Sequence, residues 1–105
     1  MEGLVDKIRE LDWSVEQIDE TIFELGKFSP AGQDFHITID SEGTADLFLN
    51  NLYKTYSNFD VSYETYLWLD KEGHGQNGAP YDMRDLYNDM ESCRKNILEL
   101  YRQLT

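Results

Sequence analysis

Apolar side chains at both ends of the chain recur in alternating steps of three and four residues. The series near the N-terminus has seven members: Leu4, Ile8, Leu11, Val15, Ile18, Ile22 and Leu25. This spacing places all members on one face of an α-helix and predicts a helix over residues 4–25, which Gly26 and Pro30 then end. Ser14 and Gln17 could form a capping box that divides the segment, but the uninterrupted series favours one long helix.

A second series of the same length and spacing occupies the C-terminal end: Met83, Leu86, Met90, Cys93, Ile97, Leu100 and Leu104. It predicts a second long helix, and Asp82 is suited to cap its N-terminus. Because narrow apolar stripes are best buried against one another, we expect the two terminal helices to pack together. Cys93 belongs to the series and is expected to be a buried apolar side chain rather than a nucleophile.

Between the two series, the pattern predicts a strand followed by a helix. Residues 35–40 alternate between apolar and polar side chains, which is typical of a strand with one buried face. The inward side chains would be Phe35, Ile37 and Ile39. A turn at residues 41–43 follows, and Thr44 is suited to cap a helix that ends near Ser57 and Asn58.

Residues 59–70 are compatible with two structures. They alternate as a strand does, yet Asp60 could equally cap a short helix that ends by Gly73. A lone strand at residues 35–40 would leave backbone groups unpaired, which favours a second, parallel strand here. We therefore expect one domain over residues 1–105 with an α/β (α+β) fold that is mostly helical. Two long heptad-patterned terminal helices would pack with a shorter helix and a small two-stranded sheet, and an all-α domain is the alternative.

The chain is strongly acidic. It has 21 Asp and Glu against nine Lys and Arg, a net charge of −12 and a pI near 4.3. Sixteen of the acids but only five of the bases lie within residues 1–72. This charge disfavours direct binding to nucleic acid or to an anionic membrane and favours a basic protein partner. No apolar membrane segment or signal-peptide pattern is present, so a cytoplasmic location is expected.

The predicted N-terminal helix carries most of its acids opposite or beside the apolar series. The carboxylates expected to contact a partner are Asp6, Glu10, Glu16, Asp19, Glu20 and Glu24. About one carboxylate per 4.5 Å of helix is sparser than one phosphate per ~3.4 Å of a DNA strand but comparable to it, so the row could imitate phosphates in a basic groove. Tyr63 and Tyr66, from the aromatic-rich middle of the chain, could add interface anchors. The common alternative is a solvated acidic face that serves solubility.

No catalytic, cofactor or metal motif emerges from the sequence. Residues 73–78 match the spacing of a dinucleotide-binding loop, but no predicted strand completes the unit and a flexible turn explains them better. Read as a calcium loop from Asp70, the segment has Tyr81 where a bidentate Glu is required. His36 and His74 lack further ligands at the spacing of a zinc site. We therefore expect no enzyme activity and no cofactor.

Four segments in the last half of the chain carry a resemblance: Phe59-Asp60-Val61, Tyr66-Leu67-Trp68-Leu69-Asp70, Asn77-Gly78-Ala79-Pro80-Tyr81-Asp82-Met83 and Asp89-Met90-Glu91. They look like small proteins carried by plasmids, prophages and integrative elements of gut bacteria. Acidic proteins of this size from such elements resemble anti-CRISPR and antirestriction inhibitors, several of which mimic DNA or cover a nucleic-acid channel. The resemblance implies a non-enzymatic inhibitor of a defence nuclease, such as a CRISPR effector, in the bacterial host cytoplasm. The alternative is a phage or plasmid assembly protein that self-associates through its helices, for example as a homodimer.

Overall fold

Four helices and three strands make up the chain. The computed structural model describes all 105 residues. Its elements are α1 (Glu2–Glu10), β1 (Ser14–Gln17), β2 (Ile22–Phe28), β3 (Asp34–Asp40), α2 (Ala45–Asn58), α3 (Val61–Leu67) and α4 (Met83–Leu104). The strands form one antiparallel sheet in the order β1-β2-β3, so the predicted α+β class is confirmed and the two-stranded sheet is not. None of the four helices combines the length and the apolar character needed to cross a lipid bilayer.

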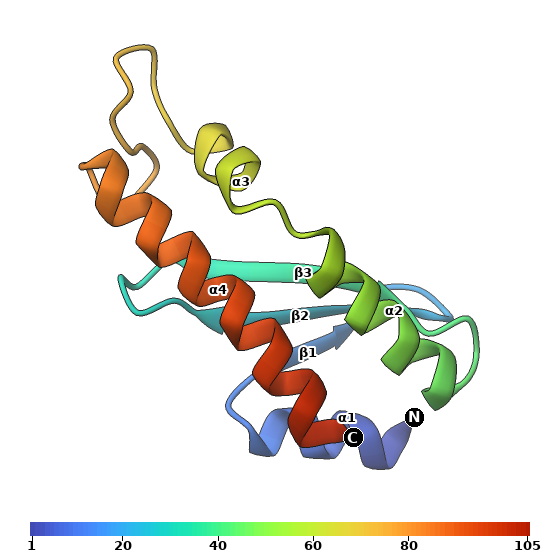
Figure 1. Ribbon diagram of the computed structural model, residues 1–105. Coiled ribbons are helices and arrows are strands. Elements are labelled where there is room, and N and C mark those ends of the chain that lie inside the picture. Colours follow the sequence, from blue (N-terminus) through green and yellow to red (C-terminus); the bar gives the residue numbers. More distant parts are fainter.

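The helices cover one face of the sheet and leave the other face open (Figure 1). Alternate residues of each strand are buried, and Val15, Leu25 and Ile37 form one row across the three strands. Phe23 and Ile39 continue this buried face. The core lies between it and the helices, which contribute Ile8, Phe48, Leu52, Ile97 and Leu100.

The long helix predicted over residues 4–25 is wrong. α1 ends at Glu10, and Asp12 adopts a φ of 67°, a left-handed conformation that an α-helix does not accommodate. The later members of the apolar series lie instead in or beside β1 and β2. Strand pairing buries Phe23, which lies outside the helical series, next to Leu25, and leaves Ile18 49% exposed.

The strand predicted at residues 35–40 is confirmed, but its pairing partner is not the predicted one. β2 pairs with it in antiparallel register, Leu25 opposite Ile37. The parallel strand favoured within residues 59–70 is wrong, because α3 forms there. The Asp60 side chain caps α3 by accepting a hydrogen bond from the Tyr63 backbone N–H at 3.1 Å, as in the alternative interpretation.

The other two helices begin and end as predicted. Thr44 caps α2 by accepting a hydrogen bond from the Leu47 backbone N–H at 3.1 Å, and α2 ends at Asn58. Asp82 caps α4 by accepting from the Arg84 backbone N–H at 2.8 Å. α4 packs against α1, α2 and α3. The expected pair of long terminal helices is therefore reduced to one long helix that a short α1 contacts.

A buried polar contact joins the β2–β3 turn to α4. Asp89, 5% exposed, accepts hydrogen bonds from Ser29 Oγ at 2.6 Å and from the Ala31 backbone N–H at 3.0 Å. Ser29 Oγ in turn accepts from the Gln33 backbone N–H at 2.9 Å. Because a carboxylate buried away from water needs such donors, this contact fixes the end of the hairpin on the helix.

Candidate partner-binding surface

The six carboxylates predicted for one helix face belong to different elements. Asp6 and Glu10 lie on α1, whereas Glu16 lies on β1 and Glu24 on β2. The remaining two, Asp19 and Glu20, lie in the turn between β1 and β2. The prediction of a single acidic helix face is therefore wrong, because the chain leaves the helix after residue 10.

The open face of the sheet nevertheless collects carboxylates. Residues that alternate with the buried row point to this side: Ser14, Glu16, Ile22, Glu24, Gly26, Phe28, Asp34, His36, Thr38 and Asp40. Four of these ten side chains are carboxylates and none is Lys or Arg. We call the set of Glu16, Glu24, Asp34, His36 and Asp40 the acidic sheet face.

Glu16 and Glu24 are direct cross-strand neighbours on this face. Side chains in such positions have Cβ atoms ~5 Å apart, and like charges there destabilise the strand pair. Thr38 is the next residue along the same row, on β3, and it carries no charge. The row therefore holds two adjacent negative charges and contributes no Lys or Arg of its own.

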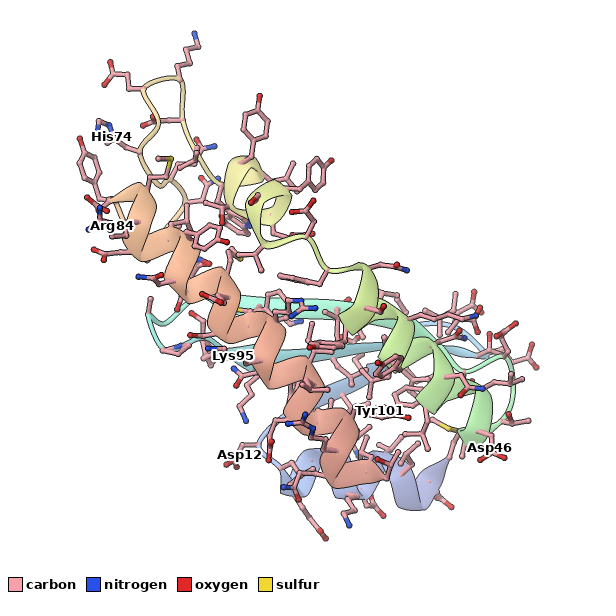
Figure 2. All side chains as sticks on the ribbon, in the orientation of Figure 1. Asp12, Asp46, His74, Arg84, Lys95 and Tyr101 are labelled. Atoms are coloured by element: carbon pink, nitrogen blue, oxygen red, sulfur yellow. The ribbon has the colours of Figure 1, made fainter.

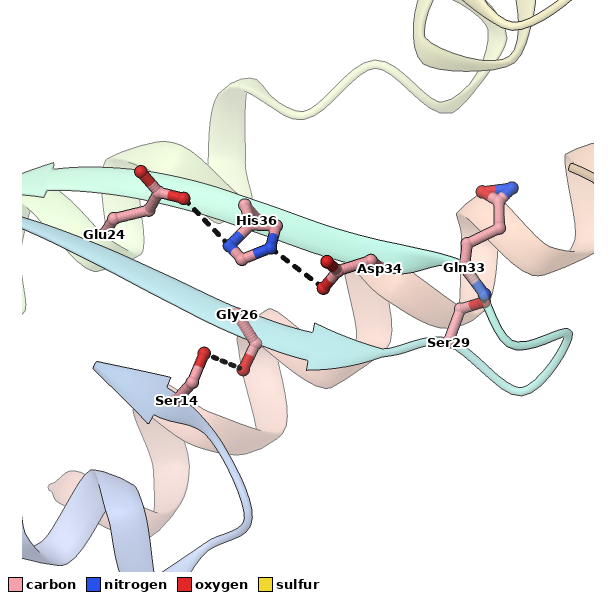
Figure 3. A network of polar contacts seen from close by, with 7 residues as sticks. All are labelled: Ser14, Glu24, Gly26, Ser29, Gln33, Asp34 and His36. Atoms are coloured by element: carbon pink, nitrogen blue, oxygen red, sulfur yellow. Dashed lines mark hydrogen bonds and ion pairs between the residues drawn. The ribbon is translucent and has the colours of Figure 1, made fainter. Parts of the chain in front are cut away.

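His36 lies between two carboxylates of the acidic sheet face (Figure 3). Its Nδ1 is 3.0 Å from Glu24 Oε1, and its Nε2 is 2.8 Å from Asp34 Oδ1. Both nitrogens can donate at once only when the ring is an imidazolium. His36 is thus the one side chain of this face that can offset its charge.

Gly26 gives the His36 ring its place. It lies opposite both Ser14 and His36, and a Cβ at this position would be 2.6 Å from His36 Cε1 and 2.7 Å from Ser14 Oγ. Because glycine has no side chain, the His36 ring can lie over β2 at this position and reach Glu24. The sequence interpretation assigned Gly26 to the end of a helix and missed this role.

Further carboxylates gather where the β1–β2 turn meets the turn that follows β3. The Ser41 backbone N–H donates to the Thr21 carbonyl at 2.7 Å, which places the two turns side by side. Asp19 and Glu20 lie on the first turn, and Glu42 lies on the second. These acids extend the negative surface beyond the end of the acidic sheet face.

The same end of the sheet approaches α1. Glu20 and Asp6 line one hollow together with Glu2 and Arg9. Two of the predicted carboxylates that are far apart in sequence, Asp6 and Glu20, are thus brought together. Glu10 is exposed on α1 and does not line this hollow.

The lysines and arginines of the chain form no ion pairs with its carboxylates. No Lys or Arg nitrogen lies within 4.0 Å of an Asp or Glu oxygen, and the three charge contacts at this distance all involve histidine. Arg9 instead donates to the Val15 carbonyl at 3.0 Å, and Lys27 donates to the Leu11 carbonyl at 3.2 Å. The guanidinium of Arg94 lies 4.2 Å from the centre of the Tyr56 ring.

Tyr63 and Tyr66 lie elsewhere, on α3, and are 58% and 71% exposed. α3 packs against α4, and Figure 1 shows α3 and the loop after it beyond the sheet, away from both chain termini. These tyrosines are accessible as predicted, but they do not adjoin the acidic sheet face. The predicted contact residues thus divide between two ends of a molecule 44 Å long.

Cys93 is confirmed as a buried side chain within α4. Burial raises the pKa of its thiol to about 12, and the nearby charges of Asp89 and Glu64 add to the effect. The thiol is therefore protonated and inaccessible at neutral pH, unlike a reactive cysteine. No three His, Cys, Asp or Glu side chains are grouped so that they could hold a metal ion.

No protein-family model matches the chain, and neither the curated proteins nor the solved structures give a match to it. Functional inference therefore rests on the side chains described above. Of these, Asp34, Asp40 and His36 were missed by sequence reasoning as parts of an acidic surface. Alternation of Glu24 with the apolar Phe23 and Leu25 was the signal that could have revealed a two-faced strand.

Proposed function

We propose that this protein is a non-enzymatic inhibitor of a bacterial defence nuclease, such as a CRISPR effector. The acidic sheet face and its adjoining turns would occupy the basic groove that receives nucleic acid, in the manner of a DNA mimic. The surface that takes the role of the phosphates is then a sheet, and not the helix that the apolar series indicated.

One observation carries the proposal: seven of the 21 acids lie on the acidic sheet face and its adjoining turns, and no Lys or Arg forms an ion pair with them. Glu16 and Glu24 are placed opposite each other at a cost to stability, with no Lys or Arg on the face. A cationic partner would relieve this repulsion on binding. It would also be attracted over a distance, because uncompensated charge accelerates association at low ionic strength.

The alternative of self-association through the helices has less support. An assembly of that kind needs an apolar helical face that is free to meet a second copy. α4 buries the middle of its apolar series, from Leu86 to Leu100, within its own chain. A second copy would also bring another net charge of −12.

The test is binding to purified CRISPR effector nucleases over a series of salt concentrations. The variant is Glu16→Gln/Glu24→Gln, and its control is Glu91→Gln/Glu99→Gln, which removes the same charge from exposed positions on α4. We expect the first variant to bind about tenfold more weakly, since two exposed ion pairs of up to ~1 kcal/mol each are lost. The control should bind nearly as the parent does.

Affinity should also fall steeply as salt rises, because charge pairing dominates the encounter. Cleavage of target DNA by the effector, measured in the same solutions, reports whether binding inhibits. Equal losses in the two variants would show that net charge, and not this face, determines binding. Unchanged affinity in both would remove the mimicry mechanism.

A further inference from the structure

The end of the molecule beyond the sheet carries a second exposed surface. It consists of α3, the loop of residues 68–82 and the first turns of α4. Six of the ten large apolar side chains that are exposed in the chain belong to it: Tyr63, Tyr66, Leu67, Tyr81, Met83 and Tyr87. Such a concentration on a single small region marks an interaction site more often than chance exposure. We call these six residues the aromatic end.

A cleft of about 1070 Å³ opens in the aromatic end. Tyr66, Tyr81 and Tyr87 line it together with Leu69 and His74. The His74 ring stacks on Tyr81, with ring centres 4.2 Å apart and planes inclined by 14°. The His74 ring thus covers one face of the Tyr81 ring. Figure 2 shows His74 and Arg84 at this end of the molecule.

Hydrogen bonds hold the loop beside the cleft in shape. The Gly75 N–H donates to the Tyr81 carbonyl and the Gln76 N–H to the Trp68 carbonyl, each at 2.9 Å. A Cβ at residue 75 would collide with the Pro80 carbonyl, so only glycine allows this close approach. The cleft is therefore formed before any partner arrives, which lowers the entropy lost on binding.

The carboxylate of Asp70 adds a second set of contacts within the loop. It accepts hydrogen bonds from the backbone N–H groups of His74 at 3.0 Å and of Glu72 at 2.8 Å. These bonds lower the pKa of Asp70, and the bond from His74 has the largest effect. These contacts give the loop a defined hydrogen-bonded shape in the structure.

Charge around the cleft selects the occupant. Residues 60–87 contain six carboxylates and only two bases, Lys71 and Arg84. Two carboxylates, Asp82 and Asp85, line the cleft itself, and Arg84 is the one Lys or Arg among its lining residues. A second copy of the chain would bring like charge, whereas a cationic segment would be attracted.

Tyrosine rings next to carboxylates are suited to guanidinium groups, because the ring face attracts a cation and the carboxylate accepts its N–H groups. The contact of Arg94 with Tyr56 shows the first of these interactions within the chain itself. We propose that the cleft binds an arginine-bearing segment of the partner, with the guanidinium on the exposed faces of Tyr66 and Tyr81 and near Asp85. This inference rests on the proposed function for the charge of the partner, but it does not depend on the acidic sheet face.

The test uses the full chain, labelled with ¹⁵N, and an acetylated and amidated peptide Gly-Arg-Leu-Arg-Gly as the probe. Replacing both arginines of the peptide by citrulline keeps the shape and removes the charge. We expect saturable chemical-shift changes around Tyr66, Tyr81 and Asp85, and at least tenfold weaker binding of the citrulline peptide. Tyr66→Ala/Tyr81→Ala should abolish these changes, whereas Tyr53→Ala, at an exposed tyrosine of α2, should retain them.

The outcomes separate this inference from the proposed function. Shift changes confined to the acidic sheet face overturn the cleft proposal and leave the inhibitor proposal standing, whereas changes at neither surface count against both. Equal binding of the arginine and citrulline peptides overturns recognition of a guanidinium. Concentration-dependent shifts at the cleft without peptide identify a second copy of the chain as the occupant and overturn the proposal as well.

Discussion

Replacement of Glu16 by Gln should stabilise the fold while it weakens partner binding. Glu16 and Glu24 lie directly opposite each other on the open face, so their carboxylates repel in the free protein. Gln keeps the size of the side chain and removes one of the two charges. Its amide can also donate a hydrogen bond toward Glu24.

The size of the effect follows from the spacing of the strands. For carboxylates ~6 Å apart, the repulsion in water is ~0.7 kcal/mol. Screening reduces it to ~0.6 kcal/mol at 0.01 M salt, where the Debye length is ~30 Å, and to ~0.1 kcal/mol at 1 M, where it is ~3 Å. With a urea m-value of ~1–2 kcal/mol/M, the unfolding midpoint of Glu16→Gln should rise by ~0.3–0.6 M at the lower salt concentration.

Urea unfolding followed by circular dichroism at both salt concentrations measures this gain. Glu91→Gln is the matched control, because Glu91 precedes Lys95 by four residues on α4 and its removal should lower stability slightly. A midpoint for Glu16→Gln that is unchanged or lowered at 0.01 M salt would refute the repulsion on which the proposed function relies. An increase of the same size at both salt concentrations would show that the gain is not electrostatic.

Three further predictions test contacts of the fold and of the face. Asp89→Ala should lower the free energy of unfolding by ~2–3 kcal/mol in urea denaturation, because it leaves buried donors without an acceptor, and Asp89→Asn should lose less. Gly26→Ala should displace the His36 ring, so that nuclear Overhauser contacts between it and Glu24 disappear while the sheet remains intact. Cys93 has a pKa raised to about 12, so the stability that its protonated thiol contributes is fully present below the pKa of the unfolded thiol and is lost as pH rises toward 12. Thermal unfolding at pH 7 and 10 should therefore show a steeper loss for the parent than for Cys93→Ala.

Local signals were sufficient to predict the second half of the fold. Thr44 and Asp82 each precede an apolar series of helical spacing and accept backbone hydrogen bonds at the start of a helix, so cap and period agree. Asp60 likewise predicted the start of α3. A strand was favoured there instead, because the strand at residues 35–40 needs a partner for its backbone hydrogen bonds. The strand does have a partner, but that partner is β2.

The first half was not predictable from spacing alone, because steps of three and four residues do not exclude strands. Burial of Phe23 beside Leu25 and pairing with β3 are tertiary gains that no local window contains. The charge of the candidate site could be read from composition, whereas its geometry could not. The strand register, which places Glu16 opposite Glu24, determines which of the acids lie together on one surface.

The two proposed surfaces would contribute to affinity in different ways, and this difference can be measured on one partner. Carboxylates on the acidic sheet face act through screened charge, so Glu16→Gln/Glu24→Gln should matter most at low salt and little at high salt. Tyr66 and Tyr81 act through ring contact and burial of apolar area, so their removal should cost a similar factor at every salt concentration. If both double variants instead lose affinity in parallel across the salt series, the two ends of the molecule do not engage the partner through separate interactions, and the division between an electrostatic face and an aromatic anchor is wrong.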